Sequence, residues 1–194
     1  MIIFEYNKSV DKRCWGRLIK AKTMFGMIFP VKFRITEHKK KECKFQAIEF
    51  KKYWQPSEKY FYKGLLKIYS KAKIPSRLIC YLNSSPYSMD DFEKGCISVS
   101  YKFKTPDKVK RVVAHELAHF LFRQAYTKYS LKVGYSETQL EDLKEILTVL
   151  HKPVLGLDDK GYKVHAKQRT QALKLWSKYH NLEKVISGLF KNKI

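Results

Sequence analysis

Paired cysteines and long apolar runs are both missing from this chain. Its four cysteines are Cys14, Cys43, Cys80 and Cys96. No two of them form a Cys-x-x-Cys pair, which argues against a zinc ribbon and against a disulfide framework, so we expect reduced, buried thiols. The most apolar stretch, 24–31, is broken by Pro30. We therefore expect neither a signal peptide nor a membrane span, and a cytoplasmic protein.

Acidic residues are few, and arginine is scarce among the basic ones. The 40 Lys and Arg residues against 18 Asp and Glu give a net charge of +22, which attracts nucleic acid without any specific site. Only seven of the 40 are arginine, although bidentate recognition of phosphates and bases is mainly arginine chemistry. Non-specific nucleic-acid contact through a basic surface stays open, and a solvated basic face is the favoured interpretation.

A length of 194 residues suits one hydrophobic core with a small appended layer. Apolar residues alternate with other residues at Val31, Phe33, Ile35, Phe45 and Ala47. This alternation is typical of strands, so residues 1–55 are expected to form a basic β-rich N-terminal layer. Residues 56–194 are expected to form a second part that packs with the first into one compact unit.

Helices and strands are both expected after residue 55. Helices are predicted over residues 56–73, 105–126, 136–150 and 168–190, the last as one or two helices. The continuous apolar run 77–82 predicts an inner strand. Strict alternation over Ile97 to Phe103 predicts an edge strand with one wet face. The predicted fold class is therefore α+β.

The motif that carries chemistry, His115-Glu116-Leu117-Ala118-His119, lies inside the predicted 105–126 helix. His115 and His119 are one turn apart, so their imidazoles share a face and can bind one metal ion. Zinc accepts imidazole nitrogens at about 2.0–2.1 Å, a spacing that one helical turn provides. Glu116 stands beside the metal, where it can take a proton from water and deliver it to a leaving amine. Burial of these side chains in an apolar helix indicates a Zn²⁺ site with Glu116 as general base.

The segment from Val112 to Phe120 resembles the active-site helix of the zincin metallopeptidases. The preceding order of helix, strand and edge strand is also similar, and the resemblance covers roughly residues 56–151. It implies a zincin-like metalloprotease domain that hydrolyses peptide bonds in a peptide or protein substrate. It also implies that the 97–103 strand binds an extended substrate by strand addition.

A catalytic zinc site has three protein ligands and a water, so the two histidines need a third ligand. In the gluzincin type of zincin, it is a glutamate on the following helix. The acidic residues on that helix are Glu137, Glu141, Asp142 and Glu145. We expect Glu145, because it neighbours Ile146 and Val149 on the inward side, with Glu141 as the alternative. The spacing of 26 residues from His119 to Glu145 also resembles small proteins of the ImmA and IrrE type.

The sequence also departs from the known zincin types. The glycine and third histidine of metzincins are absent, and Val149 stands where many gluzincins have a second acidic residue. His151 and His165 are alternative third ligands, as in SprT-like proteins. Tyr135, Tyr162 or His165 are candidates to polarise an oxyanion, although a packing role is favoured for each tyrosine. The alternative functions are a DNA-associated protease or regulator of the SprT-like or IrrE-like type, and a non-catalytic zinc-binding module.

Overall fold

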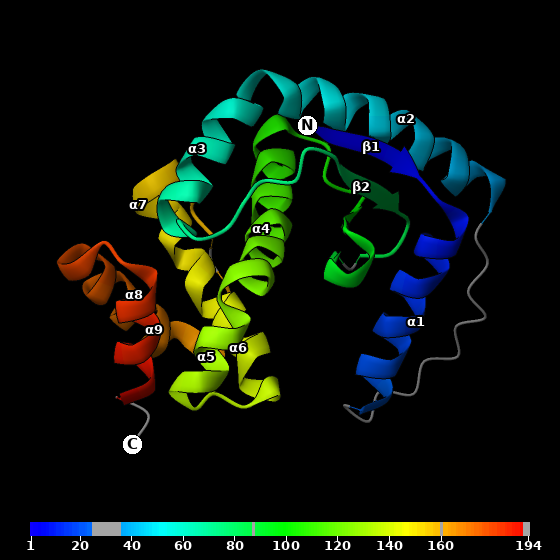
Figure 1. Cartoon of the computed structure of the whole chain (residues 1–194). Coiled ribbons are helices and arrows are strands. Elements are labelled where there is room, and N and C mark those ends of the chain that lie inside the picture. Colours follow the sequence, from blue (N-terminus) through cyan, green and yellow to red (C-terminus); the bar gives the residue numbers. More distant parts are fainter. Residues whose placement is uncertain (25–35, 87, 160, 192–194) are drawn as a thin grey trace. The chain divides into compact units, whose positions relative to one another are not determined.

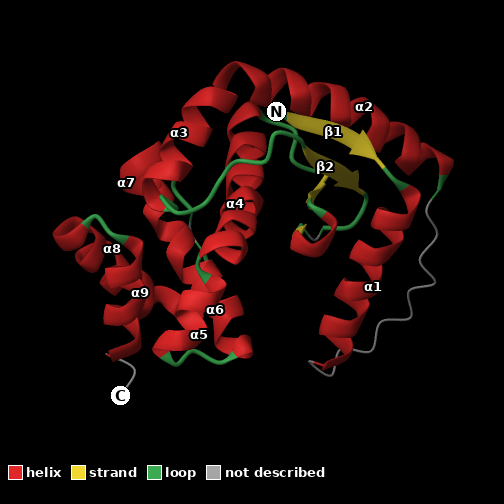
Figure 2. Ribbon diagram, in the orientation of Figure 1, coloured by secondary structure: helices red, strands yellow, loops and turns green. Residues whose placement is uncertain are grey.

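The α+β class predicted from the sequence is confirmed by the fold. The computed structural model describes residues 1–24, 36–86, 88–159 and 161–191. Within these ranges most residues are helical, and the strands form one small sheet (Figure 2). None of the described helices is long and apolar enough to cross a bilayer.

Contacts between residues divide the chain into two compact units. The first unit comprises residues 1–58 and 75–116, and the second comprises residues 59–74 and 117–194. Helix α4 (Pro106–Ala125) runs without interruption through the boundary between Glu116 and Leu117. The boundaries of these two units differ from those of the two parts expected from the sequence, residues 1–55 and 56–194. The division at residue 55 stays a prediction.

The sheet belongs to the first unit. Its strands are β1 (Ile2–Tyr6), β2 (Leu78–Asn83), β3 (Met89–Asp91) and β4 (Cys96–Ser100). They are ordered β1-β2-β4-β3, and β3 alone runs antiparallel to its neighbour. The inner position predicted for the 77–82 run is confirmed, because β2 pairs on both sides.

The prediction that residues 97–103 form an edge strand is wrong. Strand β4 lies between β2 and β3, and all five of its residues are buried. Ser98 and Ser100 suggested a wet face, yet they are about 1% exposed. Inside the sheet, Ser98 Oγ accepts a hydrogen bond from Asn83 Nδ2 at 2.8 Å and lies 3.3 Å from Cys14 Sγ. A hydroxyl with protein partners can be buried at little cost, so polar alternation did not indicate solvent here.

The N-terminal region is helical rather than β-rich, so that prediction is wrong for its described residues. Strand β1 is followed by α1 (Lys8–Met24) and α2 (Glu37–Trp54). Phe45 and Ala47 lie on α2, where Phe45 is exposed and Ala47 is buried. Residues two apart on a helix point in nearly opposite directions, so a helix between core and solvent can imitate strand alternation. The remaining alternation lies outside the described residues, at Val31, Phe33 and Ile35.

Local capping and an apolar face explain both helices. Asn7 Oδ1 accepts from the Ser9 and Val10 amides at 2.9 and 3.3 Å and so starts α1. The Thr36 side chain accepts from the Lys39 amide and starts α2. The buried side chains of α2 are Cys43, Ala47, Phe50 and Trp54. They recur at helical spacing and pack α2 along β1 (Figure 1).

A buried polar network ties α1 to the end of β2. Asp11 is fully buried, and its Oδ1 accepts from the Ser84 amide at 2.9 Å and from Ser84 Oγ at 3.0 Å. Tyr6 Oη donates to Asp11 Oδ2 at 3.3 Å, and Trp15 Nε1 donates to Ser84 Oγ at 3.1 Å. Burial raises the pKa of Asp11, and the hydrogen bonds from Ser84 and Tyr6 oppose that shift.

The four cysteines are free and buried, as expected from their spacing. Burial raises the pKa of Cys14 to about 11 and of Cys43 to about 12. It also raises the pKa of Cys96 and, more strongly, that of Cys80. All four thiols are therefore neutral at physiological pH.

The second unit is helical in its described residues. Its helices, apart from the C-terminal part of α4, are α3 (Glu58–Ile68), α5 (Thr127–Val133), α6 (Glu137–Leu147), α7 (His151–Leu155), α8 (Ala166–Tyr179) and α9 (Leu182–Lys191). They confirm the helices predicted after residue 55. Helix α6 starts with a capping box between Ser136 and Gln139. The predicted 168–190 region is two helices, separated at His180, whose φ of 45° is left-handed.

Candidate metal centre

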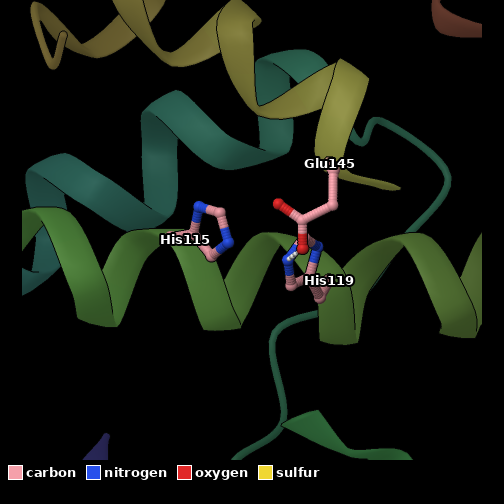
Figure 3. Close-up of side chains that lie close together, drawn as sticks. All are labelled: His115, His119 and Glu145. Carbon is pink, nitrogen blue, oxygen red and sulfur yellow. Dashed lines mark ion pairs between the residues drawn. The ribbon is translucent and has the colours of Figure 1, made fainter. Parts of the chain in front are cut away.

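Helix α4 positions both histidines of the motif. Val109 N donates to Thr105 O at 3.0 Å in the first turn, and the helix is continuous to Ala125. His115 is half-buried, and His119 is 4% exposed. Figure 3 shows the two imidazoles on the same side of α4. Their spacing is therefore set by one regular helix rather than by loops.

Glu145 meets these histidines from α6. Its Oε1 lies 3.2 Å from His119 Nε2, and its side chain is 23% exposed (Figure 3). One ligand atom from each of His115, His119 and Glu145 lies within 4.8 Å of the other two. The structure thus brings together the two motif histidines and the glutamate that helix periodicity favoured.

Arg169 on α8 holds the part of α6 that carries Glu145. Arg169 is 5% exposed, and its Nη1 donates to Glu145 O at 2.6 Å and to Thr148 Oγ1 at 3.0 Å. Thr148 Oγ1 itself donates to Glu145 O at 2.8 Å. These hydrogen bonds satisfy the Glu145 carbonyl in the last turn of α6, where the helix itself no longer provides N–H donors. Arg169 therefore fixes the backbone from which the Glu145 side chain projects.

The other side of the Arg169 guanidinium is held by the loop before α8. Its Nη2 donates to Asp159 O and lies 3.8 Å from Asp159 Oδ1. A Cβ on Gly161, where φ is 56°, would lie 2.4 Å from Arg169 Nη1, so this position requires glycine. Burial lowers the pKa of Arg169, and the carboxylates of Asp159 and Glu145 oppose that shift.

Sequence reasoning missed Arg169. The available signal was an arginine in a chain that uses lysine almost everywhere else. Arginine provides several donors in a fixed plane, which suits a carbonyl, a hydroxyl and a carboxylate at once.

Glu116 is 4% exposed on α4, immediately after His115. Its charge is the second cause, after burial, of the raised pKa of Cys80 on β2. Because Cys80 stays protonated near neutral pH, it does not exchange protons with the Glu116 carboxylate there. Glu116 is therefore a buried carboxylate on the same helical turn as the first histidine.

The alternative third ligands lie outside the cluster. Glu141 is 57% exposed and forms ion pairs with Arg123 at 2.8 Å and with Lys144 at 2.9 Å. His165 Nε2 lies 3.6 Å from Asp142 Oδ1. His151 is fully buried and, like Glu141 and His165, is not part of the cluster formed by His115, His119 and Glu145.

The oxyanion candidates have packing contacts of their own. Tyr135 Oη donates to Ile186 O at 3.1 Å, and its ring packs against Phe190 at 5.1 Å between centroids. Burial raises the pKa of Tyr135 to about 12. Tyr162 is 58% exposed and contacts the His165 ring edge-on. The packing role favoured for the tyrosines agrees with the burial and contacts of Tyr135, and it stays a prediction for the exposed Tyr162.

The inner position of β4 also removes the role implied for residues 97–103, because strand addition needs a free edge. The outer strands of the described sheet are β1 and β3.

Comparison of the chain with protein-family models, with curated proteins and with solved structures found no match. Functional inference therefore rests on the residues of the metal centre.

Proposed function

We propose that this protein is a zinc-dependent metallopeptidase with His115, His119 and Glu145 as zinc ligands. The observation that carries the proposal is the approach of their ligand atoms to within 4.8 Å of one another. Two imidazoles and a carboxylate are a donor set used by catalytic zinc sites. Tetrahedral zinc places its ligand atoms about 3.4 Å apart, close to the 3.2 Å between His119 Nε2 and Glu145 Oε1. The residues present fit the ion.

The burial pattern supports a catalytic rather than a structural site. Structural zinc sites use four protein ligands, whereas catalytic sites use three and leave a position open. The cluster contains three ligand residues, and both His115 and Glu145 retain partial exposure. Two of the three ligand residues are therefore open to water, as a site with a free coordination position requires.

A zinc ion bound there supplies Lewis acidity, which acidifies water and polarises a peptide carbonyl. Glu116 takes the proton of the attacking water and then donates it to the leaving nitrogen as the C–N bond breaks. The burial of Glu116 keeps competing solvent from this carboxylate. His115 and His119 hold fixed positions because both are on one helical face.

The test is zinc content by elemental analysis on protein purified without added metal. We expect about one zinc per chain in the wild type and in Glu141→Ala, and clear loss in Glu145→Ala. Glu141→Ala is the matched control, because it removes a carboxylate from the same helix outside the cluster. A wild type without zinc, or equal zinc in both variants, would contradict the ligand set.

A further inference from the structure

Helix α2 carries apolar side chains on two faces, and only the inner face contributes to the core. The inner face packs against β1 and β2 through buried side chains. The outer face carries Lys41, Lys44, Phe45, Ile48, Lys51 and Lys52, all of which are exposed. These positions are three, four, seven, ten and eleven residues apart from the first, so they form one stripe along the helix.

Phe45 and Ile48 are the unusual members of this outer stripe. Phe45 is 60% exposed and Ile48 is 66% exposed, and they are neighbours one turn apart. Single exposed apolar residues are common in soluble proteins. Two bulky ones side by side, surrounded by lysines, form a small apolar centre that the core does not use.

The lysines of the stripe are available to a partner. The carboxylates of α2 have partners other than the stripe lysines. Glu37 pairs with Lys40, and Glu42 lies 3.5 Å from His38 Nδ1 and is hydrogen-bonded to Tyr101. Glu49 accepts from the Tyr53 hydroxyl. No ion pair between described residues involves the four stripe lysines, Lys41, Lys44, Lys51 and Lys52. The stripe thus presents four positive charges around two apolar side chains.

We propose that the outer stripe of α2 binds the surface of an anionic lipid bilayer. Lysine ammonium groups reach lipid phosphates while their methylene stems stay with apolar groups. Phe45 and Ile48 are exposed on this face of the helix and can enter the interface between headgroups and acyl chains. An anionic bilayer therefore interacts with both the lysines and the two apolar side chains of the stripe.

Other partners use only part of the stripe. Duplex nucleic acid would use the charge but has no role for an aliphatic residue such as Ile48, and its phosphate recognition favours arginine, which is absent from α2. A folded protein partner would need an acidic groove matched to two protruding side chains, whereas a bilayer deforms around them. The inference does not depend on zinc or peptidase activity, because its residues are not part of the metal centre.

The experiment is co-sedimentation with vesicles at physiological ionic strength. Vesicles of equimolar phosphatidylcholine and phosphatidylglycerol are compared with pure phosphatidylcholine vesicles. We expect the wild type to sediment with the anionic vesicles alone. Lys41→Glu with Lys44→Glu is expected to weaken binding about 25-fold or more, since each lysine near an anionic surface contributes about fivefold. Phe45→Ser with Ile48→Ser is expected to weaken it about tenfold or more.

Matched controls separate the stripe from the general charge of +22. Lys128→Glu with Lys132→Glu changes net charge equally on the exposed side of α5. Leu131→Ser with Val164→Ser removes two apolar side chains that are 41% and 77% exposed. Both control pairs should bind vesicles like the wild type. Circular dichroism checks that each variant is folded.

A gain-of-signal variant tests the same contact without loss of function. Phe45→Trp should give a blue-shifted emission on adding anionic vesicles, because the indole leaves water. The proposal is overturned if the wild type fails to sediment, or if control and stripe variants weaken binding equally. It is also overturned if α2 binds duplex DNA with no contribution from Phe45 and Ile48 while vesicles are not bound.

Discussion

Two places in the molecule gather buried polar side chains, and they differ in how those side chains are satisfied. Around Asp11, hydroxyl and amide donors point at the carboxylate, so donors and acceptors match within the protein. In the candidate metal centre, His119 Nε2 faces Glu145 Oε1, and His115 lies in the same cluster. Each imidazole can offer a nitrogen lone pair and the carboxylate offers oxygen lone pairs, so this cluster can hold either a shared proton or a cation. The first arrangement needs no further partner, whereas the second has the donor set that the proposed zinc site requires.

The largest expected effect is on catalysis. Glu116→Gln removes the proton acceptor but keeps a side chain of the same size, so we expect hydrolysis of an unstructured protein substrate to fall about 10²–10⁴-fold. Zinc content should stay at the wild-type level, because Glu116 is not in the ligand cluster. Undiminished hydrolysis would show that this buried carboxylate is structural, like Asp11.

The next effect is on stability at the matched network. Asp11→Ala leaves the buried Ser84 amide without its acceptor, so we expect a loss of about 3 kcal/mol in the free energy of unfolding, measured by denaturant titration. Asp11→Asn keeps an acceptor for Ser84 and can donate to Tyr6, so about 1 kcal/mol is expected. Zinc content should not change in either variant. A lower zinc content in these folded variants would undo the distinction between the two sites.

A smaller effect is expected from the residue that positions Glu145. Arg169→Lys keeps one charge but cannot reach Glu145 O, Thr148 Oγ1 and Asp159 together, so zinc affinity should fall about 10–100-fold. Competition with a chromophoric chelator measures it. Lys174→Arg, an exposed substitution on the same helix, is the control. Loss of stability with unchanged zinc affinity would limit Arg169 to a role in folding.

The smallest effect is the pH dependence of Asp11. Its folded-state pKa is raised above 3.8, chiefly by burial, so the folded state favours the protonated carboxyl. That contribution is complete below the unfolded pKa and is lost as pH rises through the folded value. The stability advantage of wild type over Asp11→Asn should therefore be largest near pH 3 and shrink toward neutral pH. A constant or growing advantage would contradict the direction of the shift.

Local signals in the sequence were enough to predict the helices of the candidate metal centre. The motif histidines lie on one helix, and the Ser136 capping box and buried leucines fix where α6 starts and which way it faces. The resemblance to gluzincins directed attention to the acidic residues of this helix, and helix periodicity favoured Glu145 over Glu141. Its approach to His119 depends on packing between α4 and α6, which only the structure supplies.

Non-local contacts account for the failures. Ser98 is buried because Asn83 and Cys14, far away in sequence, provide its partners. Helix α2 carries apolar residues on two faces, so its hydrophobic pattern matched neither that of an amphipathic helix nor that of a fully buried helix. The pattern therefore predicted strands in this region. Arg169 acts on a backbone carbonyl 24 residues away, and no spacing rule marks such a contact.

The buried thiols make this chain a convenient subject for site-specific labelling. Since all four native cysteines are shielded and protonated, a cysteine introduced at position 45 or 131 should be the first to react with a maleimide dye. Native residues need not be replaced beforehand. The same shielding means that exposure of native thiols to a colorimetric reagent counts unfolded molecules directly, without a spectroscopic baseline.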